Sequence, residues 1–219
     1  MMRRRTPASE LTLGHVRTVP GDAVGHAIAL ITSAISRAGP ASHARETLVP
    51  ENVLERCAGA RLIHRTRTGT TIVRRRELLD RWLSSYADIL RPAWTVGRYR
   101  TQITDPELLE REIANAFGDH VWALGGGAAA WRMTHYYRGP DTVLHVHELP
   151  SDALKAIRAI PARDGTLTIL RVPGDVPYRG TTPHTAHPLL AYAEMISSSD
   201  PRMNEAANEL REKFLTELM

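Results

Sequence analysis

The chain has 219 residues, of which 42% are hydrophobic and only 5% aromatic, which is enough for one large or two small domains with mostly aliphatic cores. Its net charge of +4 divides into +9 over residues 1–100 and −5 over residues 101–219, and a basic half of this kind favours contact with a polyanion. A single cysteine, Cys57, excludes an intrachain disulfide and a zinc site built from several cysteines. No apolar run reaches the length of about 18 residues that a membrane span needs, so we expect a cytoplasmic protein without a membrane partner.

The front half is predicted to begin with an arm and three helices. Residues 1–20 show no periodicity and are expected to form a flexible arm. Apolar residues spaced three and four apart predict an amphipathic helix over 23–37, which a Gly-Pro pair ends. Shorter helices are expected over 41–47 and over 51–58.

A basic hairpin is predicted next. Two short runs of β-favouring residues, 61–65 and 70–75, flank a turn that contains Gly69. A further helix is expected from Glu77 until Arg91-Pro92 ends it. Three helices followed by a hairpin is the order of a winged helix-turn-helix, in which the third helix enters the major groove of DNA and the hairpin contacts the backbone. We therefore predict a winged-helix domain over residues 21–90.

The predicted DNA contacts are mostly arginines. Residues 61–76 include six arginines and no acidic residue. Arginine binds phosphate and guanine through two hydrogen bonds, and each phosphate contact steepens the salt dependence of binding by about 0.9 in log–log slope. The candidates are Asn52, for a base edge, and Arg56, Arg61, Arg65, Arg67, Arg74, Arg75 and Arg76, for phosphates. A solvated charged hairpin on an ordinary helical domain is the alternative, because Glu51 and Glu55 repel phosphate.

A second, α/β domain is predicted over residues 104–219, after a boundary between about 90 and 104. A helix is expected from Thr104, with Pro106 in its first turn. Strands are expected over 121–124, 142–148, 166–172 and 176–179. Further helices are expected over 128–133, 151–160, 187–197 and 201–217, the last capped by Asp200.

Three glycines at 125–127, between a predicted strand and a predicted helix, favour the binding of an anion. They lack the spacing of the glycines in a dinucleotide-binding turn, and no P-loop lysine follows them. The arrangement is similar to that of polymerase-β-type nucleotidyltransferases, whose next strand carries two Mg²⁺-binding carboxylates two residues apart. Here those positions hold His145 and His147, which are poor Mg²⁺ ligands. We therefore expect a nucleotidyltransferase-like fold without catalytic residues or a cofactor. Zinc bound by these histidines with His135 or Glu148 is one alternative, and a partly exposed strand face is the other.

Four short segments carry a resemblance to a known family. They are ELLDRW at 77–82, WALGGGAAA at 122–130, YYRGP at 136–140 and HPLLAYAE at 187–194. Together they resemble the AbiEi-like transcriptional regulators, which are the antitoxins of type IV toxin–antitoxin systems. The resemblance covers most of the chain.

The resemblance implies a DNA-binding N-terminal domain that represses its own operon and a nucleotidyltransferase-like C-terminal domain that counteracts a nucleotidyltransferase toxin. We therefore expect a non-enzymatic α+β protein whose partners are operator DNA and such a toxin. Two alternatives stay open: a nucleotidyltransferase-like enzyme with an atypical metal site, and a stand-alone protein-interaction module.

Overall fold

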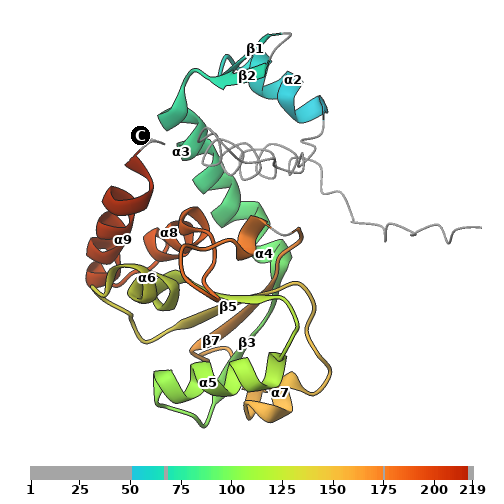
Figure 1. Cartoon of the computed structure of the whole chain (residues 1–219), viewed down its shortest axis with the longest axis vertical. Helices are drawn as coiled ribbons and strands as arrows, with labels where there is room; N and C mark the ends of the chain where they lie inside the picture. Colours follow the sequence, from blue (N-terminus) through green and yellow to red (C-terminus); the bar gives the residue numbers. More distant parts are fainter. Residues whose placement is uncertain (1–50, 67–68, 175, 217–219) are drawn as a thin grey trace, which may run out of the picture.

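The structure is a computed structural model, and it describes residues 51–66, 69–174 and 176–216. The arm predicted over 1–20 and the helices predicted over 23–37 and 41–47 lie outside these residues. The described part is α+β, with a small hairpin unit at one end and a five-stranded mixed sheet flanked by helices at the other (Figure 1). The predicted class is confirmed at this level.

The hairpin unit consists of α2 (Glu51–Gly59), β1 (Ile63–Thr66) and β2 (Gly69–Ile72), and the two strands pair antiparallel. The helix predicted over 51–58 and the hairpin are thereby confirmed. Leu62 holds the unit together, because its N–H donates to the carbonyl of Cys57 at 2.9 Å and its own carbonyl accepts from the N–H of Val73 at 2.9 Å. Its side chain and that of Cys57 are buried, which gives this short unit a small apolar core.

A continuous helical run leads from the hairpin to the sheet. It consists of α3 (Arg75–Ser85), the π-helical turn η1 (Tyr86–Leu90) and α4 (Arg91–Trp94) (Figure 1). Its buried stripe includes Trp82 and Tyr86, whose rings stack with centroids 5.3 Å apart.

The prediction that Arg91-Pro92 ends this helix is wrong. The N–H of Arg91 donates to the carbonyl of Tyr86, five residues earlier, which is the hydrogen-bond pattern of a π turn. Pro92, which has no N–H to donate, follows directly after this π turn, at the start of α4. The helix therefore continues to Trp94, and Thr95 turns into an extended conformation.

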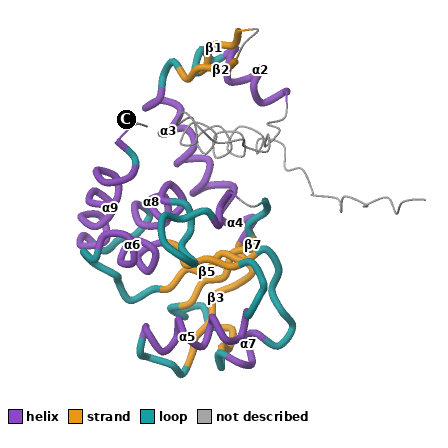
Figure 2. The backbone as a smooth tube through the Cα atoms, viewed as in Figure 1, coloured by secondary structure: helices purple, strands orange, loops and turns teal. Residues whose placement is uncertain are grey.

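The sheet consists of β3 (Thr95–Thr101), β4 (Trp122–Gly125), β5 (Thr142–Val146), β6 (Ala159–Pro161) and β7 (Leu167–Arg171). Their order is β4-β5-β7-β3-β6, in which only β5 and β7 pair parallel (Figure 2). The interval 91–103, where the sequence predicts a domain boundary, thus contains α4 and a strand inside the sheet.

Helices cover both sides of the sheet (Figure 2). On one side lie α5 (Pro106–Phe117) and the short α7 (Ala153–Ala156); on the other lie α6 (Gly126–Thr134), α8 (Pro188–Ile196) and α9 (Pro201–Phe214). Asp200 caps α9 as predicted, accepting from the N–H of Arg202 at 2.9 Å. None of the helices in the described ranges is long and apolar enough to cross a bilayer.

Two predicted elements differ from the structure. The helix expected over 151–160 is only α7, because Arg158 adopts a left-handed conformation with φ of 51° and the chain then enters β6. The strand expected over 176–179 is instead a 3₁₀ turn, η2 (Val176–Tyr178). Pro177 has no N–H to donate to a strand ladder, and the hydroxyl of Tyr178 donates to the carbonyl of Val172 at 2.7 Å.

Candidate functional site

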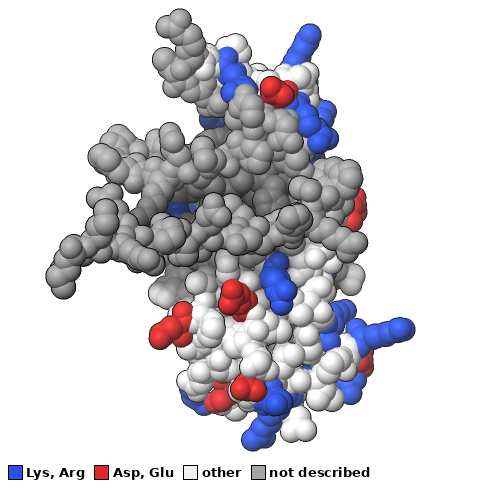
Figure 3. Space-filling view, turned by 90° about the vertical axis from the view of Figure 1, so that its right-hand side faces the viewer, with Lys and Arg blue, Asp and Glu red and all other residues white. Residues whose placement is uncertain are grey.

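The predicted DNA-contact residues lie on what we call the hairpin arm, which comprises α2, β1, β2 and the first turn of α3. Several basic side chains lie at this end of the molecule, and others lie at the opposite end (Figure 3). The arginines of the arm that the structure describes are all exposed: Arg56, Arg61, Arg65, Arg74, Arg75 and Arg76. Arg67 lies outside the described residues, and so does the side chain of Asn52, whose backbone belongs to the first turn of α2.

The start of α3 carries three adjacent arginines, Arg74 to Arg76, and its N-cap residue is one of them. The side chain of Arg74 makes no capping hydrogen bond, since a guanidinium cannot accept, and its Nη1 donates to Glu77 Oε2 at 3.1 Å. Glu77 also accepts from Arg81 Nη2 at 2.7 Å, and these two hydrogen bonds lower its pKa. Positive side chains at a helix N-terminus oppose the helix dipole. An anion beside this turn would offset the unfavourable charge.

A buried hydrogen-bonded group joins the helical run to α8. The carboxylate of Glu194 is 2% exposed, and it accepts from the hydroxyl of Tyr86 and from Nε of Arg91, at 3.1 Å to Oε1 and 2.9 Å to Oε2. Burial, together with the nearby carboxylate, raises the pKa of Tyr86 well above its usual value, so the phenol stays protonated and donates. Sequence reasoning missed this group. Its signal is a glutamate in α8, whose sequence PLLAYAEMI is otherwise apolar.

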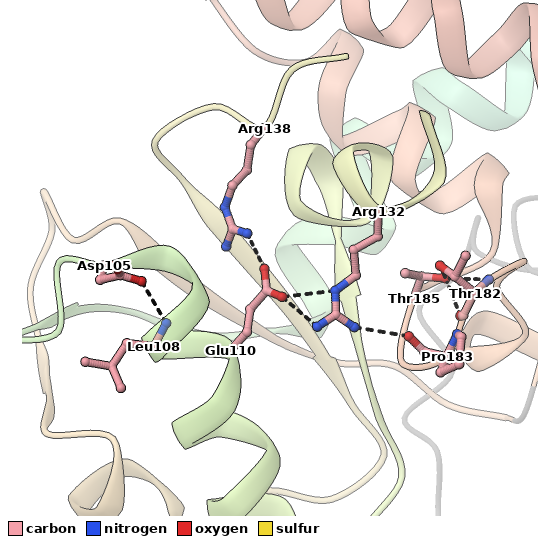
Figure 4. Close-up of polar contacts among 8 residues, drawn as sticks. All are labelled: Asp105, Leu108, Glu110, Arg132, Arg138, Thr182, Pro183 and Thr185. Atoms are coloured by element: carbon pink, nitrogen blue, oxygen red, sulfur yellow. Dashed lines mark hydrogen bonds and ion pairs between the residues drawn. The ribbon is translucent and has the colours of Figure 1, made fainter. Parts of the chain in front are cut away.

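A second group of ion pairs ties α5 to the segments around α6 (Figure 4). Glu110 is buried, and Arg132 donates to its Oε2 from Nε at 3.0 Å and from Nη2 at 2.6 Å. Arg138 donates to the other carboxylate oxygen, and Arg132 also donates to the carbonyl of Pro183 at 3.2 Å. These contacts hold together helices and loops from both sides of the sheet, so we assign them a structural role.

The two histidines of the predicted strand lie in different surroundings. His145 is fully buried, and burial, with a smaller effect of the Arg91 charge, lowers its pKa to about 3. Neither ring nitrogen of His145 has a hydrogen-bond partner in the described structure. His147 follows the end of β5 and is exposed. Within the described residues no three His, Cys, Asp or Glu side chains are placed to share a metal ion, so the structure does not bring the predicted zinc ligands together.

The glycine turn borders a cavity of about 460 Å³. Gly126 has a φ of 52°, which favours glycine, and a Cβ on Gly127 would lie 1.9 Å from the carbonyl oxygen of Arg138. The cavity is lined by the start of α6, by the turn between α8 and α9, and by Arg91 and Arg98. Gly125 and Gly127 thus allow tight packing, and Gly126 and Gly127 leave bare backbone at the cavity wall.

The structure defines an α+β protein in which a basic hairpin arm is joined by a continuous helix to a sheet-containing body. A family model described as transcriptional regulator, AbiEi antitoxin, type IV toxin–antitoxin system, matches residues 71–216, about two thirds of the chain. The chain therefore belongs to the AbiEi family of type IV antitoxins and transcriptional regulators. The match begins within β2, so α2 and β1 precede it. No curated protein and no solved structure shows a significant match to the chain.

Proposed function

We propose that this protein binds operator DNA through its hairpin arm, represses its own operon and counteracts a nucleotidyltransferase toxin. The observation that carries the DNA-binding part is the set of exposed arginines on the arm, with no acidic residue between positions 61 and 76. Arg56, Arg61, Arg65, Arg67 and the three arginines at 74–76 are assigned to phosphates, and Asn52 to a base edge.

The first turn of α3 supports this assignment most strongly. Three adjacent arginines lie at the N-terminus of α3, where their charges and the helix dipole repel one another, and the acid of this turn, Glu77, is already paired with Arg74 and Arg81. Such local conflicts are expected where a ligand supplies the compensating charge. A DNA phosphate would add further negative charge and acceptor oxygens at this turn.

Operator binding tests the DNA-binding part. The full chain is titrated into DNA from upstream of its own gene, and affinity is measured by fluorescence anisotropy at about 50 mM and about 200 mM salt. We expect the variant Arg74→Ala/Arg76→Ala to bind more weakly, with a salt slope lower by about 0.9 for each phosphate that it no longer neutralises. The control, Arg163→Ala/Arg171→Ala, removes two arginines that are also exposed but lie outside the arm, and it should bind like the unaltered protein. If the chain binds this DNA at neither salt concentration, the proposed role as a DNA-binding regulator is wrong.

The antitoxin part rests on the family and on the charge of the C-terminal half, which is −5 over residues 101–219. We assign toxin neutralisation to the sheet-containing body and no enzymatic activity to it, because His145 lies in the protein interior. The nucleotidyltransferase-like character of this fold stays a prediction.

Co-expression tests the antitoxin part. A nucleotidyltransferase encoded next to this chain is expressed alone and together with it, and growth is measured. We expect the full chain to restore growth, and we expect Arg74→Ala/Arg76→Ala to restore it equally, since the arm serves DNA. If neither the unaltered chain nor the variant restores growth, the proposal that this protein counteracts the toxin is wrong. If only the unaltered chain restores growth, the arm takes part in neutralising the toxin.

A further inference from the structure

The cavity beside the glycine turn takes no part in the proposed contacts with DNA. Its volume of about 460 Å³ lies within the range of small-molecule sites, about 300–1,000 Å³. Segments far apart in sequence line it, among them the π turn, β3, the start of α6, β5, β7 and the turn between α8 and α9. It is therefore a product of the whole body fold.

Two guanidinium groups reach this cavity with hydrogen-bonding capacity to spare. Arg91 contacts Glu194 through Nε, and in the described structure its two terminal nitrogens make no hydrogen bond. The nearest carboxylate oxygen to Arg98 is Asp141 Oδ2, at 3.8 Å, which is longer than a hydrogen bond. The two side chains are 33% and 47% exposed, so a ligand in the cavity has access to both. Paired guanidiniums with unused donors favour a phosphate group.

The carboxylates around the cavity divide into occupied and available ones. Glu194 already accepts from Tyr86 and Arg91, and Asp200 accepts from the N–H of Arg202 and the hydroxyl of Tyr137. Asp141 is 56% exposed, and in the described structure it makes the long contact with Arg98 and a charge interaction with Arg91 but no hydrogen bond to either. It is therefore the carboxylate best placed to accept from a ligand.

Hydroxyl groups add to the lining. Thr168 on β7 and the serines at 197–199, between α8 and α9, all border the cavity. A simple anion would use the two arginines but none of these acceptors. A molecule that combines a phosphate with hydroxyl and amino donors would use both sets, and a nucleotide is such a molecule.

From these contacts we propose that the cavity binds a free nucleotide. Arg91 and Arg98 hold its phosphate beside the bare backbone of Gly126 and Gly127, while Asp141 and the hydroxyls accept from its sugar and base. This site is separate from the hairpin arm, so it adds a small-molecule ligand to the proposed DNA-binding antitoxin.

Calorimetric titration of the full chain with ATP, GTP, adenosine and inorganic phosphate tests the proposal. We expect ATP or GTP to bind saturably with one site per chain, and adenosine and phosphate each to bind at least tenfold more weakly. Saturation by neither nucleotide would overturn the proposal. Phosphate that binds as tightly as the nucleotides would overturn it as well, because the sugar and base would then make no contact.

Two substitutions on one strand locate the site. Arg98→Gln removes a cavity guanidinium and should weaken nucleotide binding at least tenfold. Arg100→Gln, two residues further along β3, removes an arginine that pairs with Asp164 and does not line the cavity, so it should bind as before. Equal affinities of the two variants would refute the assignment. Operator affinity measured on the same samples separates the two proposals, since neither residue belongs to the arm.

Discussion

Removal of the Tyr86 hydroxyl tests how strongly α8 is tied to the helical run. The hydroxyl is fully buried and donates to the charged carboxylate of Glu194. A hydrogen bond to a charged group contributes about 1.5–3 kcal/mol, and Tyr86→Phe removes the donor while keeping the ring. We therefore expect the free energy of unfolding to fall by about 2 kcal/mol. Urea denaturation measures it through tryptophan fluorescence, since Trp82 stacks on this ring, and the m-value should stay unchanged.

Tyr178→Phe is the matched control. The Tyr178 hydroxyl is part-buried and donates to the neutral carbonyl of Val172 at 2.7 Å. Loss of a neutral hydrogen bond costs about 1 kcal/mol, half of the expected effect at Tyr86. Equal losses in the two variants would refute the reasoning, because the charge of Glu194 would then add nothing to the bond.

Three further predictions concern the core and the arm. His145→Leu should stabilise the protein by about 1 kcal/mol, because it removes two buried nitrogens without hydrogen-bond partners. The folded-state pKa of His145, about 3, lies below its ordinary value of 6.5, so the unaltered protein should lose stability as the pH falls from 6.5 towards 3. The variant should lose less stability over this range. Identical pH profiles of the two proteins in urea denaturation would contradict this. Gly127→Ala should destabilise the protein by at least about 2 kcal/mol, because the new Cβ clashes with the Arg138 carbonyl. Gly59→Ala, at the end of α2 with open space around it, is the control and should be neutral or stabilise the protein by about 0.5 kcal/mol. Thermal unfolding measures both. Asn52→Ala should reduce the difference in binding free energy between operator and unrelated DNA by about 1–3 kcal/mol, measured by competition anisotropy. An unchanged difference would exclude a base contact by Asn52.

Local signals in the sequence predict most of the elements that the structure describes. The hairpin follows from its β-favouring runs around Gly69, and α9 follows from a capping Asp200 before a proline at its first position. Each of these signals lies within a few residues of the element that it predicts, so a single sequence is enough to find it.

Contacts between distant residues could not be predicted in this way. Tyr86 and Glu194 lie 108 positions apart, and each has a side chain that fits an ordinary helix. The place of β3 between β7 and β6 depends on pairings with residues about 60 to 75 positions later in the chain. The arginines of the arm could be found from composition alone, but the arginines of the cavity became visible only when the fold brought Arg91 and Arg98 together.

The unbroken path from α3 into β3 limits how this protein could be recombined. Every residue from Arg75 to Thr101 belongs to a helix or a strand, so a junction at any point between them would cut a regular element. A chimaera that took its hairpin arm from one relative and its sheet-containing body from another would have to carry this whole segment, together with a glutamate at position 194 to accept from the incoming tyrosine. We expect arms and bodies in such proteins to be inherited together, and engineered exchanges to succeed only when both sides of that contact are transferred.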